Sequence, residues 1–152
     1  MSEKIDVQEM SGCVCQSARQ LARQLTLLYD AAMAPSGLTS VQFGVLARLY
    51  ALGHKGQAGV SLGALAQRVG RHASTVTRDL QPLVKAGLVT LADDASDRRV
   101  RTVRVTAKGS TQLQKAFPLW RQAQVRVRDT LGGGAASELK RAMDGASVAL
   151  TD

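Results

Sequence analysis

Apolar residues recur at intervals of three and four over much of the chain, as they do along one face of an α-helix. A first stripe starts near Cys13 and stops before Pro35-Ser36-Gly37, and it consists of Val14, Ala18, Leu21, Leu25, Leu28 and Ala32. A second helix is predicted from Thr39 to Gly53, because Thr39 and Gln42 stand at the spacing of a capping box. Its predicted inward side chains are Val41, Val45, Leu46, Leu49 and Leu52.

Two short helices that meet at a glycine are predicted next. Val60-Ser61 is expected to form a short strand that leads into a helix from Leu62 to Val69, with Ser61 as its N-cap. Gly70 then supplies a sharp turn, and the following helix runs from about Ala73 to Gly87. The side chains predicted to face inward from this helix are Val76, Leu80, Leu83 and Val84.

A β-hairpin and a long helix complete the pattern. Leu88 to Ala92 and a β-branched run through Val100, Val103 and Val105 are predicted as its strands, joined by a polar turn from Asp93 to Arg98. The last long helix is predicted from Ala107 to Leu131 and would span roughly 37 Å. A break at Gly132-Gly133-Gly134 precedes a shorter helix. The predicted fold is therefore mainly α with one small hairpin.

The terminal helices flank a small centre that cannot cover both of their apolar faces. Packing them against the same helices of a second chain would cover these faces, so we expect a two-fold homodimer. The chain is thus divided into an N-terminal dimerisation helix (residues 1–38), a central lobe (39–109) and C-terminal dimerisation helices (110–152). We call the two terminal parts the arms.

The charge is concentrated in the central lobe. The chain of 152 residues has 20 Lys and Arg against 12 Asp and Glu, a net charge of +8, and the lobe alone has a net charge of +7. Such a balance indicates a polyanionic partner, either nucleic acid or an acidic membrane surface. A polar start, no apolar run near ~20 residues and only two cysteines predict a cytoplasmic protein without a membrane span.

The helix after Gly70 begins with small polar side chains and arginine, which suit phosphate oxygens and base edges. A recognition helix of a helix–turn–helix places such N-terminal residues in the major groove of double-stranded DNA, and Arg78 is expected to contact a guanine there. Arginines at the hairpin tip can contact phosphates or a narrow minor groove. The candidate DNA-binding residues are Arg71, His72, Ser74, Thr75, Thr77, Arg78, Arg98, Arg99 and Arg101.

Several segments resemble the MarR family of winged helix–turn–helix transcription regulators. They are the stretch 73–78 with Ala86-Gly87-Leu88-Val89, the hairpin or wing signature Asp97-x-Arg99 followed by Val103-x-Val105-Thr106-x-x-Gly109, and Pro35-x-Gly37-Leu38-Thr39. The resemblance implies a triangular dimer on a pseudo-palindromic operator, with Asp97 orienting Arg99. It also implies a repressor that is released by a small, often aromatic, ligand bound between arms and lobe. His72 departs from the family, since many members have an acidic residue there, and so does Pro82 inside the recognition helix.

The sequence also offers residues for chemistry other than DNA binding. Cys13 and Cys15 could act as redox sensors, although two residues spaced this way on a helix point apart, and buried cysteines are the commoner outcome. Tyr29 and Trp120 on the arm helices could stack on an aromatic effector, or could simply belong to a core. No catalytic set, metal site or cofactor is predicted. The alternatives are an architectural, non-specific DNA-binding protein and a protein-interaction module.

Overall fold

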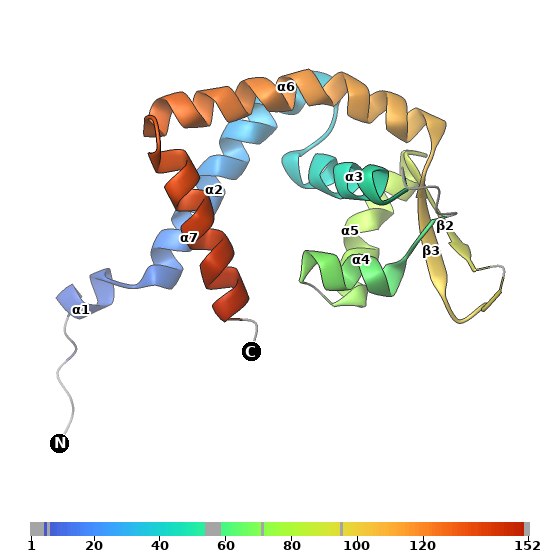
Figure 1. Ribbon diagram of the computed structural model, residues 1–152, viewed down its shortest axis with the longest axis horizontal. Coiled ribbons are helices and arrows are strands. Elements are labelled where there is room, and N and C mark those ends of the chain that lie inside the picture. Colours follow the sequence, from blue (N-terminus) through green and yellow to red (C-terminus); the bar gives the residue numbers. More distant parts are fainter. Residues whose placement is uncertain (1–4, 6, 54–58, 71, 95, 151–152) are drawn as a thin grey trace.

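The computed structural model describes residues 5, 7–53, 59–70, 72–94 and 96–150. The long helix α6 (Ala107–Leu131) joins two parts of the molecule (Figure 1). Helix α7 extends from one end of α6, α2 reaches α6 near its middle, and the central lobe lies at the other end. The remaining elements are α1 (Val7–Ser11), α2 (Val14–Met33), the 3-10 turn η1 (Ala34–Ser36), α3 (Ser40–Gly53), β1 (Val60–Ser61), α4 (Leu62–Val69), α5 (Ala73–Lys85), β2 (Val89–Asp93), β3 (Arg101–Val105) and α7 (Ala135–Ala149).

The element order and the mainly helical fold agree with the sequence prediction, down to the bounds of α6. The capping box is also confirmed: the N–H of Gln42 donates to Oγ1 of Thr39 at 3.2 Å, and the N–H of Thr39 donates to Oε1 of Gln42 at 3.0 Å. Ser61 caps α4 by accepting the N–H of Ala64 at 3.1 Å. The five-residue helix α1 was not predicted, because it is too short to show a periodic stripe.

The predicted short strand at Val60-Ser61 is confirmed as β1, and its pairing with the hairpin, which was not predicted, gives a three-stranded sheet. Its order is β1-β3-β2 and both pairings are antiparallel, with Val60 opposite Val103 and Val89 opposite Val105. The second hairpin strand begins at Arg101, so Val100 lies in the turn instead of the strand. We call β2, β3 and the turn between them the wing.

The core of the central lobe is formed by side chains from α3, α4, α5 and the sheet. Those with almost no exposed surface are Leu46, Leu49, Leu65, Leu80, Leu83, Val89 and Val103. Leu113 and Ala116 of α6 belong to the same core, so packing is continuous across residue 109. One predicted inward residue is wrong: Val41 is 54% exposed, and Phe43 is buried instead. At about 100° per residue, Val41 lies roughly 200° around α3 from Phe43.

The start of α6 is fixed against the end of α5. The N-cap Thr106 accepts the N–H of Gly109 at 3.0 Å and donates its hydroxyl to the carbonyl of Gly87 at 2.7 Å. Its backbone N–H donates to the carbonyl of Leu88 at 3.0 Å. Gly109 is buried directly against that carbonyl, where any side chain would overlap the Leu88 oxygen. The wing and the recognition segment are thereby attached to the long helix.

Candidate nucleic-acid interface

Helix α5 has one apolar and one polar face. Val76, Leu80 and Leu83 are buried, whereas Ser74 and Arg78, one turn apart, are both exposed. Thr75 and Thr77 are half-buried, and the hydroxyl of Thr77 donates to the carbonyl of Ala73 at 2.9 Å. The sequence therefore places a short row of polar side chains on the solvent side of a helix whose other side is held by the core.

At the N-terminus of α5 no side chain caps the first backbone amides, although the amide of Thr75 already donates to the carbonyl of His72 at 3.0 Å. His72 occupies the N-cap position with an extended backbone (φ −66°, ψ 144°), and its side chain makes no capping hydrogen bond. The first amide groups of a helix carry partial positive charge, which favours a nearby anion such as a phosphate. Gly70, with φ +61°, makes the turn between α4 and α5. Arg71 lies outside the described residues.

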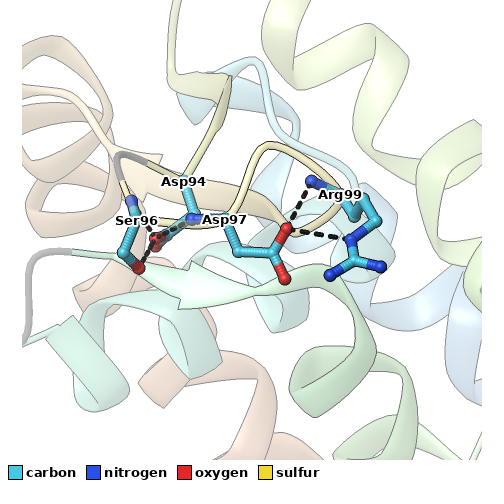
Figure 2. Close-up of polar contacts among 4 residues, drawn as sticks. All are labelled: Asp94, Ser96, Asp97 and Arg99. Atoms are coloured by element: carbon cyan, nitrogen blue, oxygen red, sulfur yellow. Dashed lines mark hydrogen bonds and ion pairs between the residues drawn. The ribbon is translucent and has the colours of Figure 1, made fainter.

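Asp94 organises the turn of the wing (Figure 2). Its Oδ1 accepts hydrogen bonds from the N–H of Ser96 at 2.9 Å, from the hydroxyl of Ser96, and from the N–H of Asp97 at 3.4 Å. The bonds from Ser96 lower the pKa of Asp94 below its ordinary value, with the Asp97 amide adding to the effect. The sequence prediction overlooked this residue, although Asp-x-Ser is a turn pattern in which the carboxylate bonds the backbone two residues later.

Asp97 in turn positions Arg99. Its Oδ1 accepts the backbone N–H of Arg99 at 3.0 Å and the Nε–H of the same residue at 3.3 Å (Figure 2). The Arg99 side chain is nevertheless 92% exposed, so its terminal nitrogens remain accessible. An exposed ion pair contributes little stability. The contact instead restricts the direction in which the guanidinium points.

The other wing arginines are also exposed. Arg101 lies 4.0 Å from Asp93 across the hairpin, and Arg98 stands at the tip. Arg104, which was not among the predicted residues, is exposed on the same strand. The structure thus brings Arg98, Arg99 and Arg101 together on the wing and keeps Ser74 and Arg78 on α5.

An aromatic cavity of about 380 Å³ lies where α3 meets α6. Phe43, Ala47 and Tyr50 line it from α3, and Leu113, Gln114, Phe117 and Trp120 line it from α6. The Trp120 ring stacks on Phe43 with centroids 5.7 Å apart and on Phe117 with centroids 5.6 Å apart. Tyr29 does not line this cavity; it is half-buried on α2, and burial raises its pKa. Of the two predicted effector residues, only Trp120 faces the cavity.

Cys13 and Cys15 are both exposed and unpaired with each other, which contradicts the expectation of buried thiols. Cys13 precedes α2 as its N-cap residue, and only Cys15 lies within the helix. The argument that helical geometry points them apart therefore does not apply. In the described part of the chain, no helix is long and apolar enough to cross a membrane, and no three His, Cys, Asp or Glu side chains gather as a metal site would require.

Comparison with known proteins gives consistent matches. The family model that describes the MarR family matches residues 36–100. The structure of the M. tuberculosis transcriptional regulator MosR in complex with DNA is 37% identical in sequence, with a TM-score of 0.78 over 90% of this chain and 95% of that chain. A comparison with curated protein sequences gave no match.

Two more distant structures share the fold. The transcriptional repressor CouR, bound to a 23-mer DNA duplex, is 23% identical with a TM-score of 0.78, over 95% of this chain and 99% of that chain. The PcaV regulator from Streptomyces coelicolor, in complex with its natural ligand, is 20% identical with a TM-score of 0.79, over 97% and 99%.

Proposed function

Because this chain belongs to the MarR family of DNA-binding transcriptional regulators, we propose that it is a repressor that binds a pseudo-palindromic operator as a homodimer. The observation that carries the proposal is that two exposed groups of polar and basic side chains are held by the same buried core. These are the polar face of α5 around Arg78 and the wing arginine Arg99 held by Asp97. The net charge of +7 in the central lobe supports a polyanionic partner.

The proposed residue roles follow from position. Arg78 contacts a guanine edge in the major groove, where its two terminal nitrogens match O6 and N7. Ser74, Thr75, Thr77, His72 and Arg71 contribute contacts to phosphates and neighbouring bases. Arg99 enters or borders the minor groove, and Arg98 and Arg101 contact the flanking phosphates.

The proposed dimer uses the arms, residues 1–38 and 110–152. Helix α7 has no buried side chain in the single chain, so its packing surface faces outward. Most of the large apolar side chains that are exposed lie on the arms: Ile5, Val7, Met10, Val14, Leu27, Phe117, Val125, Leu131, Met143, Val148 and Leu150. A second copy would cover this surface and place two recognition helices on successive half-sites.

Fluorescence anisotropy tests the proposed function. The full chain is titrated into labelled DNA from the region upstream of its own gene, with unlabelled random DNA as competitor, over a salt series. A preference of ~10³ or more for the upstream DNA, together with a clear salt slope, is the expected result. Equal affinity for both DNAs would instead indicate an architectural DNA-binding protein.

Replacing Asp94 by alanine is expected to weaken DNA binding severalfold, although the change removes a negative charge next to the DNA. Without Asp94, Ser96 and Asp97 lose the acceptor that fixes the turn, and Asp97 no longer presents Arg99 in one direction. The same anisotropy titration measures the effect. Because the lowered pKa keeps Asp94 ionised, wild-type affinity should not change through this group until the pH falls below its ordinary range.

Asp93→Ala is the matched control, since it removes the same charge one residue earlier, where the partner is Arg101 at 4.0 Å. This control should bind DNA as tightly as wild type or more tightly, for electrostatic reasons. If Asp94→Ala behaves in the same way as Asp93→Ala, the turn does not position the wing arginine.

We further propose that a small aromatic molecule releases the DNA by binding the cavity between α3 and α6. Its stacked lining of Phe43, Phe117 and Trp120 suits a planar ring. Because the chain has a single tryptophan, quenching of its fluorescence reports occupancy of this cavity directly. A compound that lowers operator affinity without quenching Trp120 would place the effector elsewhere.

Oxidation is a second proposed route of release, because both thiols are exposed on the arm near the start of α2. Peroxide should lower operator affinity of the wild type in the anisotropy assay and leave a Cys13→Ser/Cys15→Ser double variant unaffected. If peroxide lowers the operator affinity of both proteins equally, or of neither, Cys13 and Cys15 have no redox role in DNA release.

A further inference from the structure

A second cavity, of about 340 Å³, lies in the central lobe between α3, α4 and α5 and opens to solvent beside the exposed side chains of Val41 and Arg48. It is separate from the aromatic cavity and shares no lining residue with it. Its apolar lining comes from Val41 and Val45 of α3, Leu65 and Val69 of α4, and Val76 of the recognition helix. The volume is within the range of small-molecule sites, and the apolar part of the lining is aliphatic throughout.

Gly44 widens this cavity from the α3 side. A Cβ at this position would meet nothing closer than Nη1 of Arg48, at an ordinary contact distance of 3.6 Å, so packing does not require a glycine. Glycine in a helix interior costs about 1 kcal/mol relative to alanine. Gly44 therefore lowers the stability of α3, and the effect seen in the structure is additional space in the cavity.

Arg48 supplies the polar group of the cavity. Its guanidinium lies beside Gly44, one turn later on α3, and lines the cavity. The structure shows no ion pair or hydrogen bond from Arg48 to another described residue. Asp79 lines the cavity from α5, and its negative charge disfavours an anion on that side. An anionic group is therefore favoured at the Arg48 side, with the apolar body among the valines.

We propose that this cavity binds a small carboxylic acid with a compact aliphatic body, whose carboxylate pairs with Arg48. Branched aliphatic chains fit the valine and leucine lining better than a planar ring, which the aromatic cavity accommodates. Since Val76 and Asp79 belong to α5, an occupant contacts the element that presents Arg78. Its effect on DNA affinity rests on the proposed function, whereas its binding does not.

Methyl NMR on the protein without DNA tests the binding step. The probe is 4-methylpentanoate, titrated into full-length protein labelled at valine and leucine methyl groups. The expected result is saturable shifts of the Val41, Val45 and Val76 methyls. Arg48→Gln should weaken binding by roughly tenfold or more, and the neutral probe 4-methylpentanamide should be weaker by a similar factor. Gly44→Leu should abolish the shifts by filling the cavity.

Arg126→Gln is the matched control, because it removes a positive charge on α6 that does not line this cavity. It should leave the affinity for 4-methylpentanoate unchanged. Shifts confined to the neighbourhood of Trp120, no saturable shifts, or an Arg48→Gln variant that titrates like wild type would each overturn the proposal. If the probe binds as expected and DNA binding is absent, the site stands and the proposed function fails.

Discussion

Replacing Gly109 by alanine is expected to destabilise the fold by about 3 kcal/mol, the upper part of the range for overpacked sites. A Cβ there would overlap the carbonyl oxygen of Leu88 and would lie 2.9 Å from Cγ1 of Val105. The Leu88 carbonyl cannot move away freely, because it accepts the N–H of Thr106. The clash therefore pushes α6 away from the wing rather than shifting a flexible side-chain end.

Urea unfolding followed by circular dichroism measures this loss, at equal protein concentration because subunit association contributes to stability. Gly63→Ala is the control: Gly63 lies inside α4, and a Cβ added there would have no described neighbour within 4 Å. That variant should be at least as stable as wild type, because alanine has a higher helix propensity than glycine. A Gly109→Ala variant as stable as wild type would mean that α6 and Leu88 are not in close contact.

Arg78→Ala is expected to weaken operator binding by about 1–3 kcal/mol, between roughly fivefold and 150-fold, and to relax the preference at one base pair. The reason is its position. Arg78 is exposed one turn beyond Ser74, on the face opposite Val76 and Leu80. Anisotropy titrations on the operator and on operators with single base-pair changes measure both effects.

Lys85→Ala provides the comparison, since it removes one positive charge from the last turn of the same helix. Lys85→Ala should weaken operator binding far less than Arg78→Ala does and should leave the base preference unchanged. If Arg78→Ala lowers the affinity for all DNA sequences equally, Arg78 contacts a phosphate rather than a base. If the variant binds the operator as tightly as wild type, α5 is not part of the DNA interface.

The sequence predicted the helices well where a stripe and its caps agreed. The end of α6 follows from Gly132, and α4 follows from Ser61 and Gly70, whereas the N-cap of α6, Thr106, was not identified as a cap from the sequence. Val41 was placed wrongly because periodicity alone does not tell which of two apolar stripes on α3 faces the core. Phe43 takes that position through its stacking on Trp120, a contact between residues far apart in the chain. The pairing of β1 with β3 also joins residues far apart in the chain, and a local sequence pattern therefore does not predict it.

The candidate site was predicted in part. The exposed polar row of α5 follows from local pattern, whereas the contact from Asp97 to Arg99 was expected from the family resemblance, and both are present in the structure. Asp94 was missed because it acts indirectly: it fixes the turn that positions Asp97, and Asp97 in turn positions Arg99. The two cavities could not be predicted, since each is formed by side chains from separate helices.

One helix, α6, runs without interruption from the wing to the far end of the arm. Its 25 residues correspond to about 37 Å, so a tilt of about 5° at the arm displaces the other end by about 3 Å. That distance is close to the rise of one base pair along DNA, about 3.4 Å. A small change in the angle at which the two arms cross would therefore change, by about one base pair, the spacing between half-sites that the dimer can bind. Operators with one base pair added between half-sites would be discriminated by arm geometry, with no change in any residue that touches a base.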